Sequence, residues 1–120
     1  MGFSDFFASS CETRELHRDE QLRTRYYRNR FEHCQEALET FAKQEGMTVE
    51  SVDRVHGEIF LIGPRFECIA TVSQLTPLET GIDLKVNYPG AGWGKPKKTV
   101  LAIYRHLNSA LQFKGVSLHP

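Results

Sequence analysis

The sequence lacks any segment long enough to cross a membrane and any recognisable export signal. No apolar run in its 120 residues approaches the roughly 20 residues of a transmembrane helix. The first ten residues, MGFSDFFASS, have neither the basic start nor the apolar stretch of a signal peptide. Phe6 also stands where N-myristoylation requires Ser or Thr. We therefore expect a cytoplasmic protein without a membrane partner.

Cysteine and histidine are too few and too scattered to form a recognisable metal-binding or redox motif. The three cysteines are an odd number without a C-x-x-C pair, which is not a disulfide framework. No two of the five histidines lie four residues apart, the spacing of a helical metal site. We predict no metal, no cofactor and no catalytic residue, and we lean towards a protein that is not an enzyme. The residues concerned are Cys11, Cys34, Cys68, His17, His33, His56, His106 and His119.

One enzymatic alternative stays open. Cys34 or Cys68 could form a nucleophilic pair with a histidine that the fold brings near. The candidate partners are His56 and His106. Both cysteines fall on predicted apolar faces, however, where a free cysteine is usually an inert small hydrophobic residue. This favours reduced, structural thiols.

The chain has no net charge, so it has no overall excess that would attract nucleic acid or a membrane surface. The charges are nevertheless segregated along the sequence. Residues 21–30 carry four arginines, and residues 94–120 carry four lysines and one arginine, with no acidic residue in either segment. If the fold brings these two segments together, a neutral protein acquires a basic face.

The composition is that of a globular domain, with 40% hydrophobic, 25% charged and 11% aromatic residues. The length is that of one domain. We predict a single α+β domain over residues 20–115, a partly ordered arm over residues 1–19 and a tail over residues 116–120. Within the arm, FSDFFA (residues 3–8) could form one helical turn.

Hydrophobic periodicity places a strand and then a helix after the arm. QLRTRYY (residues 21–27) alternates as a strand does. Apolar residues then recur at helical spacing until Gly46, which predicts a helix over residues 30–45. The apolar positions are Phe31, Cys34, Leu38 and Phe41. A continuous helix from about Glu12 to Glu45 is the alternative, because the arginines would also suit a helix face.

Three or four strands and a second helix complete the pattern. The strands are expected within residues 47–53, 55–63, 65–75 and 80–88, the last with Ile82, Leu84, Val86 and Tyr88 facing inward. The second helix starts near Pro96, which suits a first turn, and ends before Gly115. We therefore predict an antiparallel sheet of four to five strands with both amphipathic helices on one face, in the order β-α-β-β-β-β-α.

The loop NYPGAGWGKPKKTV (residues 87–100) has the composition of a phosphate-binding loop but the wrong spacing. The P-loop pattern needs four residues between its glycines, whereas Gly90 and Gly94 are separated by three. Pro96 also replaces the hydroxyl residue and removes a backbone N–H that would face a phosphate. The loop is better explained as a strand exit that carries Trp93 to the sheet edge and leads into the second helix.

The lysines that follow this loop have no evident partner. They stand at the helix end that favours anions, which suggests an anion or an acidic partner. Together with the arginines between residues 21 and 30 and the nearby aromatic rings, they could bind single-stranded nucleic acid. The candidate residues for nucleic-acid or anion binding are Arg23, Arg25, Arg28, Arg30, Trp93, Lys95, Lys97 and Lys98.

The leading functional hypothesis is a small interaction or assembly module that binds an unknown protein partner or a second copy of itself. The motivation is an ordinary globular composition without a catalytic motif. A homodimer contact is expected on the sheet face opposite the helices, which mixes polar and apolar residues. The residues expected on that face are Arg23, Arg25, Tyr27, Ile69, Thr71, Asp83 and Lys85. Weak nucleic-acid or anion binding is the second hypothesis.

Overall fold

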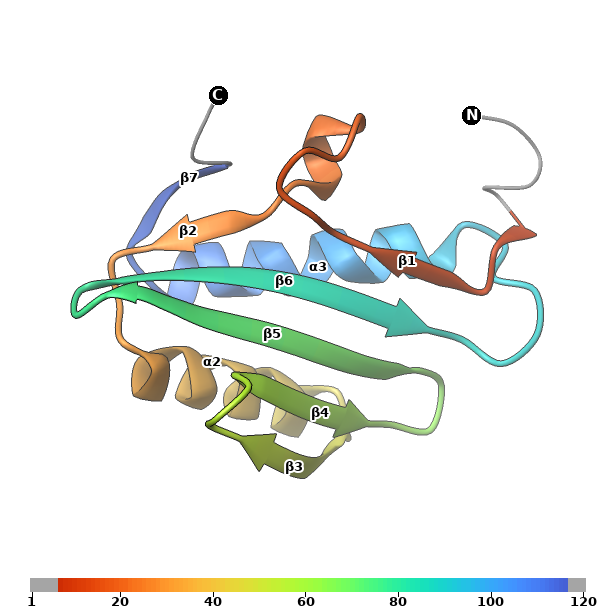
Figure 1. Cartoon of the computed structure of the whole chain (residues 1–120). Helices are drawn as coiled ribbons and strands as arrows, with labels where there is room; N and C mark the ends of the chain where they lie inside the picture. Colours follow the sequence, from red (N-terminus) through yellow and green to blue (C-terminus); the bar gives the residue numbers. More distant parts are fainter. Residues whose placement is uncertain (1–6, 117–120) are drawn as a thin grey trace.

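The computed structural model describes residues 7–116, which form a seven-stranded antiparallel sheet and two α-helices (Figure 1). The strands are β1 (Ser10–Glu12), β2 (Arg25–Tyr27), β3 (Thr48–Asp53), β4 (Glu58–Ile62), β5 (Glu67–Thr76), β6 (Glu79–Asn87) and β7 (Phe113–Val116). The helices are α2 (Phe31–Gln44), α3 (Lys95–Ala110) and a 3-10 helix, η1 (Glu20–Leu22). The predicted α+β class is confirmed. The two additional strands, β1 and β7, have only three and four residues, too few to show a period.

The strand order is β3-β4-β5-β6-β2-β7, and β1 pairs with the same edge of β6 as β2 does. β1 lies beside residues 85–87 of β6, and β2 lies beside residues 80–82. Between these two strands, residues 13–24 leave the sheet edge and extend over α3, where Asp19 contacts Lys97 (Figure 1). The N-terminal strands β1 and β2 are therefore assembled on the long β5–β6 hairpin, and β7 is added at the free edge of β2.

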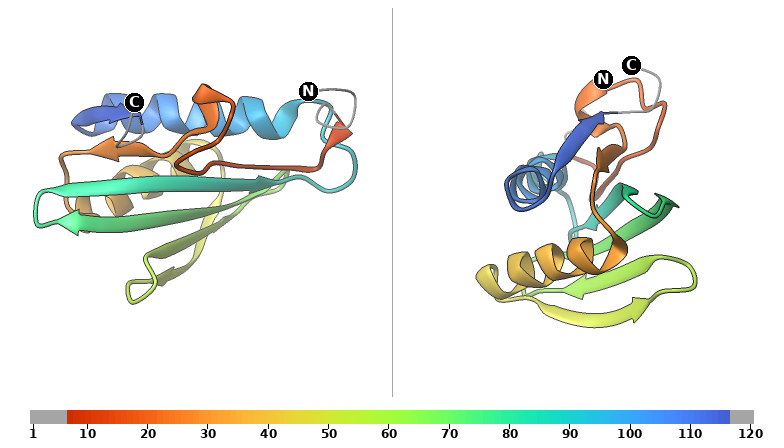
Figure 2. Two further views of the ribbon diagram at one scale, coloured as in Figure 1. Left: turned by 45° about the horizontal axis from the view of Figure 1, so that its top comes forward. Right: turned by 90° about the vertical axis from the view of Figure 1, so that its left-hand side faces the viewer.

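Both α-helices cover the same face of the sheet, as predicted (Figure 2). Their apolar stripes and the inward side chains of the central strands form one buried cluster. The inward residues of β5 and β6 are Cys68, Ala70, Val72, Ile82, Leu84 and Val86, each at most 2% exposed. This alternation was predicted because a strand with one covered face must place every second side chain in the core.

The two helices begin and end near the positions that the sequence predicts. α2 starts one residue after the predicted start and is followed by Gly46, whose φ of +66° is the left-handed geometry that ends a helix. α3 carries Pro96 in its first turn and is preceded by Gly94 at φ +77°. The alternative of one helix from Glu12 to Glu45 is not formed.

The strand predicted over residues 21–27 is shorter than expected, because its first half forms η1. The Asp19 side chain accepts a hydrogen bond from the backbone N–H of Gln21 at 3.0 Å and so caps the 3-10 turn. Only residues 25–27 pair with β6 and β7. Residues 21–27 do alternate as a strand would, but the cap by Asp19 places residues 21 and 22 in the 3-10 turn instead.

The sheet face opposite the helices differs from the prediction at β2. Ile69 pairs with Lys85, and Thr71 pairs with Asp83, and these four residues do share that outer face. Arg25, in contrast, pairs with the inward residue Ile82 and so faces the helices. Its guanidinium lies 4.4 Å from the centre of the Tyr104 ring on α3. The prediction that placed Arg25 on the outer face is wrong, because this stacking partner draws its side chain inward.

Two other residues of the predicted outer face also lie elsewhere. Tyr27 is fully buried on the helix side, and its hydroxyl is hydrogen-bonded to the side-chain amide of Asn108 at 2.6 Å. Arg23 lies between η1 and β2 and bonds to the backbone of His17. Most of the helical turn predicted for residues 3–8 lies outside the described residues, as do His119 and the rest of the tail after Val116.

Candidate functional site

An N-terminal segment, residues 7–24, lies across the start of α3 and the edge of β6. From here on, the arm means these residues, which overlap the arm predicted over residues 1–19. Its first residues pack on the loop before α3, where the Gly92 N–H donates to the carbonyl of Phe7 at 3.2 Å. The Tyr88 N–H donates to the carbonyl of Ser9 at 2.7 Å, and β1 continues this pairing along β6. The arm is thus fixed at the same end of the molecule as the glycine-rich loop.

Thr13 fastens the arm where it leaves β6. Its backbone N–H donates to the carbonyl of Leu84 at 2.9 Å, and its hydroxyl accepts the Leu84 N–H at 3.0 Å. The same hydroxyl donates to the Asp83 carboxylate at 2.7 Å. The hydroxyl of Tyr104, on α3, lies 3.0 Å from that of Thr13. One side chain therefore connects the arm, the sheet and α3.

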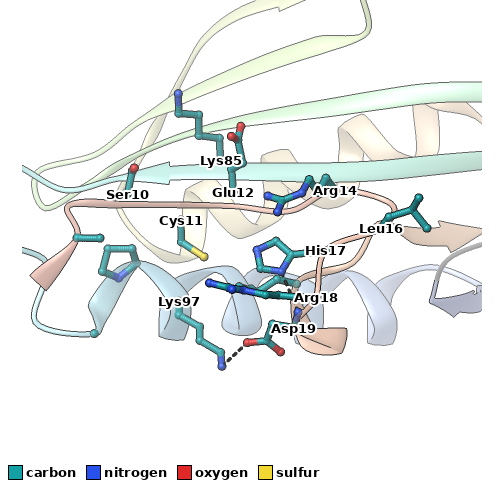
Figure 3. A pocket seen from close by; sticks show the side chains of 14 residues that line it. Ser10, Cys11, Glu12, Arg14, Leu16, His17, Arg18, Asp19, Lys85 and Lys97 are labelled. Carbon is teal, nitrogen blue, oxygen red and sulfur yellow. Dashed lines mark hydrogen bonds and ion pairs between the residues drawn. The ribbon is translucent and has the colours of Figure 1, made fainter. Parts of the chain in front are cut away.

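A cavity of about 580 Å³ lies between the arm and the start of α3; we call it the arm cleft (Figure 3). Its volume is in the range of small-molecule sites. The lining residues are Ala8, Ser10, Cys11, Glu12, Arg14, Leu16, His17, Arg18, Asp19, Leu22, Lys85, Gly94, Pro96 and Lys97. Most of them belong to the arm, so the arm builds the cleft.

The cleft wall carries more positive than negative charge. Four lining side chains are cationic and two are anionic, which leaves a net charge of +2 if His17 is neutral. The cations are Arg14, Arg18, Lys85 and Lys97, and the anions are Glu12 and Asp19. Asp19 is bound internally, because Lys97 donates to it at 2.8 Å and thereby lowers the pKa of that carboxyl. Figure 3 shows Lys85 and Glu12 extending away from His17 and Lys97, so the groups that face the cavity are three cations, Arg14, Arg18 and Lys97, and one anion, Asp19.

His17 lies among these cations and is held in its neutral form. Burial and then the charge of Arg14 lower the pKa of its imidazole, and Arg18 and Arg23 act in the same direction. Its Nδ1 accepts the backbone N–H of Asp19 at 3.0 Å, so the neutral ring carries its proton on Nε2. His17 is thus a neutral donor in a positive field.

The thiol of Cys11 faces the same cavity but is not activated as a nucleophile (Figure 3). Burial raises its pKa to about 11, although the charge of Lys97 acts in the opposite direction. A thiol with this pKa is protonated near neutral pH, whereas nucleophilic cysteines need a lowered pKa. The cleft therefore favours binding over covalent chemistry.

The Cys–His pairs that the sequence left open do not form. Burial raises the pKa of Cys34 to about 11 and that of Cys68 to about 12. His56 lies 2.8 Å from Asp53 in an exposed turn, and His106 lies 2.9 Å from the backbone carbonyl of Ala37. Each histidine is thus occupied by a partner other than a cysteine.

Among residues 7–116 no group of three or more His, Cys, Asp or Glu side chains is placed to hold a metal ion. No helix formed by these residues is long and apolar enough to cross a membrane. Charged groups from distant parts of the sequence meet in the arm cleft and also in a groove lined by Glu45, Arg65, Lys95 and Lys98.

The structure separates Arg28 and Arg30 from Lys95 and Lys98, which the sequence would combine only if the fold brought the two basic segments together. The Arg28 N–H donates to the carbonyl of Gln112 at 2.8 Å, which places residues 28–30 beside the C-terminal end of α3. Lys95 and Lys98 stand at the other end of this 16-residue helix. The separation is roughly 24 Å at 1.5 Å per residue. These four residues therefore do not share one basic face.

The predicted site residues divide into four groups. Arg23 and Lys97 adjoin the arm cleft, because Arg23 donates to the carbonyl of His17 at 2.7 Å. Arg25 is directed to Tyr104, and Arg28 and Arg30 are exposed at the far end. Lys95 and Lys98 line a separate groove beside Phe66 and Tyr88.

Trp93 does not pack on the sheet edge as predicted. Its ring lies 4.9 Å from that of Phe7, edge to face, and the residue is 57% exposed. The predicted positive φ angles of the loop are observed at Gly90 and Gly94. Gly92 serves another purpose, since a Cβ there would lie 2.0 Å from the carbonyl oxygen of Ala8. The loop glycines therefore admit the arm rather than a phosphate.

Sequence reasoning missed Arg14, His17 and Arg18, which contribute most to the cleft. They belong to RELHRDEQLR (residues 14–23), in which acidic and basic residues alternate without a clear period. Arg14 and Arg18 are four residues apart, but the segment forms no α-helix that would make this spacing meaningful. These residues line one cavity because the arm contacts α3, and no local sequence pattern predicts this contact.

No known protein family, curated protein or solved structure matches the chain. Function is therefore inferred from the geometry and chemistry of the described residues.

Proposed function

We propose that the protein is a non-enzymatic binding module whose arm cleft binds an anionic ligand. The observation that carries this proposal is the position of three cationic side chains, from the arm and from α3, around one cavity (Figure 3). Arg14 and Arg18 come from the arm and Lys97 from α3, whereas the Lys85 side chain extends away from them. The acidic side chain beside these cations is Asp19, to which Lys97 donates.

Electrostatics explains why such a site would attract anions. Like charges held close together repel one another, and the charges of Arg14 and Arg18 add to the larger effect of burial in lowering the pKa of His17. An anion in the cavity relieves this repulsion, and the concave wall strengthens its attraction by excluding part of the water. The arm cleft is thus a different anion site from the one predicted by the sequence. Of the eight residues of the predicted site, Lys97 also lines the cleft.

Isothermal titration calorimetry with small aromatic and inorganic anions tests this proposal. We expect binding that weakens as salt is raised, because exposed charges are screened. Arg18→Gln should weaken binding about tenfold, which corresponds to one charge–charge contact near a protein surface. Arg105→Gln is the matched control, since Arg105 is exposed on α3 and does not line the cleft. Equal affinities of these two variants for every anion would contradict the proposal.

Self-association is a second candidate, favoured by the outer face of β4 and β5. Phe60 and Ile69 are cross-strand neighbours there, and Ile62 is 37% exposed on the same face. In the described part of the chain both α-helices lie on the opposite face (Figure 2). Apolar side chains surrounded by polar ones are typical of contact surfaces between subunits.

Sedimentation equilibrium tests this second candidate. We expect a dimer that Ile69→Lys dissociates, because a buried unpaired ammonium is costly at an interface. Lys85→Gln, at the position that pairs with Ile69, is the control that removes a charge without placing one in the apolar contact. A wild-type protein that remains monomeric at millimolar concentration would exclude this contact.

Nucleic-acid binding remains a third hypothesis, now limited to separate small patches. Fluorescence anisotropy with single-stranded DNA and RNA at about 50 mM salt tests it. A true phosphate contact steepens the salt dependence, so Arg28→Gln with Arg30→Gln should flatten it. Absence of binding at this low salt would remove the hypothesis.

A further inference from the structure

The size of the arm cleft indicates that its ligand is larger than a simple ion. A five-atom oxyanion fills about two to three water volumes, or roughly 60–90 Å³. The cavity of about 580 Å³ has several times that space. A ligand that occupies it therefore carries an organic part besides its charge.

The lining provides an apolar wall for such a part. Leu22 is buried beneath the cavity, and Pro96 is buried at the start of α3. Leu16 is 75% exposed and stands at the border of the cavity. Because Leu22 and Pro96 are already buried, an apolar group would remove hydrocarbon surface from water chiefly by covering Leu16, which is favourable at about 25 cal/mol per Å².

The positive charge of the cleft is concentrated rather than spread along it. Arg14 and Arg18 are both close enough to His17 to lower the pKa of its imidazole. Lys97 is close enough to Cys11 to act on the pKa of its thiol, and in Figure 3 the Arg18 guanidinium extends toward Lys97. A head group with two charges on one centre fits this arrangement better than two single charges at opposite ends of a ligand.

Phosphate monoesters combine these properties. At pH 7 a monoester phosphate carries a charge of about −1.5 to −2 on three acceptor oxygens. Arginine guanidinium groups bind such oxygens in pairs, and the neutral Nε2–H of His17 adds a donor. The net charge of +2 on the cavity wall matches a dianion.

We propose that the natural ligand of the arm cleft is a small organic phosphate monoester, with its phosphate at Arg14, Arg18 and Lys97 and its organic part on Leu16. This inference rests on the proposed anion-binding function. It further specifies that the ligand has a doubly charged head group and an organic part.

Three probes of related shape separate these two additions. Phenyl phosphate carries both the second charge and the ring, phenyl sulfate has the ring with a single charge, and inorganic phosphate has no ring. Calorimetry on the full chain at about 50 mM salt should give an affinity for phenyl phosphate about tenfold higher than for either other probe. At about pH 5 the preference over phenyl sulfate should shrink, because the phosphate takes up its second proton near pH 6.

Two variants assign the preferences to residues. Arg18→Gln should reduce the preference for phenyl phosphate over phenyl sulfate, whereas Leu16→Ser should reduce its preference over inorganic phosphate. Both residues are exposed, so neither change is expected to unfold the protein. Arg105→Gln should leave both preferences unchanged.

Each result is decisive. Equal affinity for phenyl phosphate and phenyl sulfate would contradict the preference for a doubly charged head group. Equal affinity for phenyl phosphate and inorganic phosphate would contradict the contribution of the organic part. In both cases the proposal of anion binding would still hold. If phthalate, a dicarboxylate, binds as tightly as phenyl phosphate, the ligand class is not restricted to phosphate monoesters and this part of the proposal is wrong. No binding of any probe would contradict the proposed function as well.

Discussion

At Gly92 the backbone approaches the arm so closely that a single methyl group would not fit. A Cβ there would lie 2.0 Å from the Ala8 carbonyl oxygen and 2.7 Å from the Pro96 ring. We expect Gly92→Ala to destabilise the protein by about 1–3 kcal/mol, because the arm or the start of α3 must shift. Urea unfolding followed by circular dichroism measures this loss.

Gly115→Ala is the matched control for this prediction. Gly115 has open space around its Cβ position and no positive φ angle. The same added methyl group should therefore change stability little at this position in β7. Equal costs at the two glycines would show that steric contact with the arm is not the cause.

His17 should make stability depend on pH in a direction that its environment determines. Burial and the nearby arginines lower its pKa in the folded state below about 6.5. The unfolded chain therefore takes up the proton first as the pH falls through about 6.5, and stability is lost until the lower folded pKa is reached. Above about pH 6.5, His17 contributes no such dependence.

Comparison of the wild type with His17→Gln isolates this effect. We expect the wild type to lose more stability than the variant between about pH 7.5 and pH 5 in urea unfolding. The comparison is needed because His56 acts in the opposite sense. The hydrogen bond to Asp53 raises the pKa of His56, so its contribution is present at low pH and lost as the pH rises. Parallel curves for the two proteins would contradict the assignment to His17.

At the scale of elements, one side-chain hydroxyl, that of Thr13, adds to the backbone pairing that attaches the arm to β6. Thr13→Val keeps the shape of the side chain but leaves the Leu84 N–H and the Asp83 carboxylate without this partner. We expect a loss of about 1–3 kcal/mol, the usual cost of a buried polar group left unsatisfied. Thermal or urea unfolding measures it.

Two further variants define the role of the Thr13 hydroxyl. Thr13→Ser retains the hydroxyl and should recover most of the stability. Thr24→Val removes the other hydrogen bond to Asp83, at 2.7 Å, and should cost less because no backbone N–H is left unpaired. A Thr13→Ser variant as unstable as Thr13→Val would show that packing of the methyl group matters instead.

The elements that the sequence predicts well are the long ones. α2 has 14 residues and β6 has nine, so each repeats its period several times, and its inward residues follow from counting. β1 has three residues and β7 has four, and their pairing depends on β6 and β2 being in place. Short strands of this kind arise from tertiary contact and leave little trace in the sequence.

The candidate site was less predictable than the fold for the same reason. Among the residues first proposed, Lys97 lines the cleft and Arg23 adjoins it, whereas Arg28 and Arg30 lie at the other end of α3. Local composition identified basic segments correctly but could not give their distance in space. Arg18 was passed over because its segment has no period.

At the scale of the whole molecule, the two proposed contact surfaces lie on different sides. The arm cleft lies beside the first turns of α3, and the outer face of β4 and β5 lies on the side of the sheet away from both helices (Figure 2). We expect ligand binding in the cleft and contact between copies to involve different residues apart from Lys85, which lines the cleft and also pairs with Ile69 on the outer face. Ile69→Lys should leave the affinity for phenyl phosphate unchanged, which calorimetry can check.

The attachment of the arm to the rim of a finished sheet has a consequence for its dynamics. The β5–β6 hairpin and the two helices share the buried cluster, whereas the arm contributes mainly Leu22 to it. The arm can therefore detach in a local opening that costs less free energy than global unfolding. We expect the amide protons of residues 10–13 to exchange with deuterium faster than those of residues 68–71, which pair with β4 and β6 and not with the arm.

Because the cleft exists only while the arm is attached, its ligand binds the closed state alone. Phenyl phosphate should then slow deuterium exchange in the arm selectively, by a factor that grows with ligand concentration, and leave the hairpin almost unchanged until global unfolding dominates. The binding site would thus form only when the arm attaches to the folded sheet, and the ligand would stabilise the arm in this attached position.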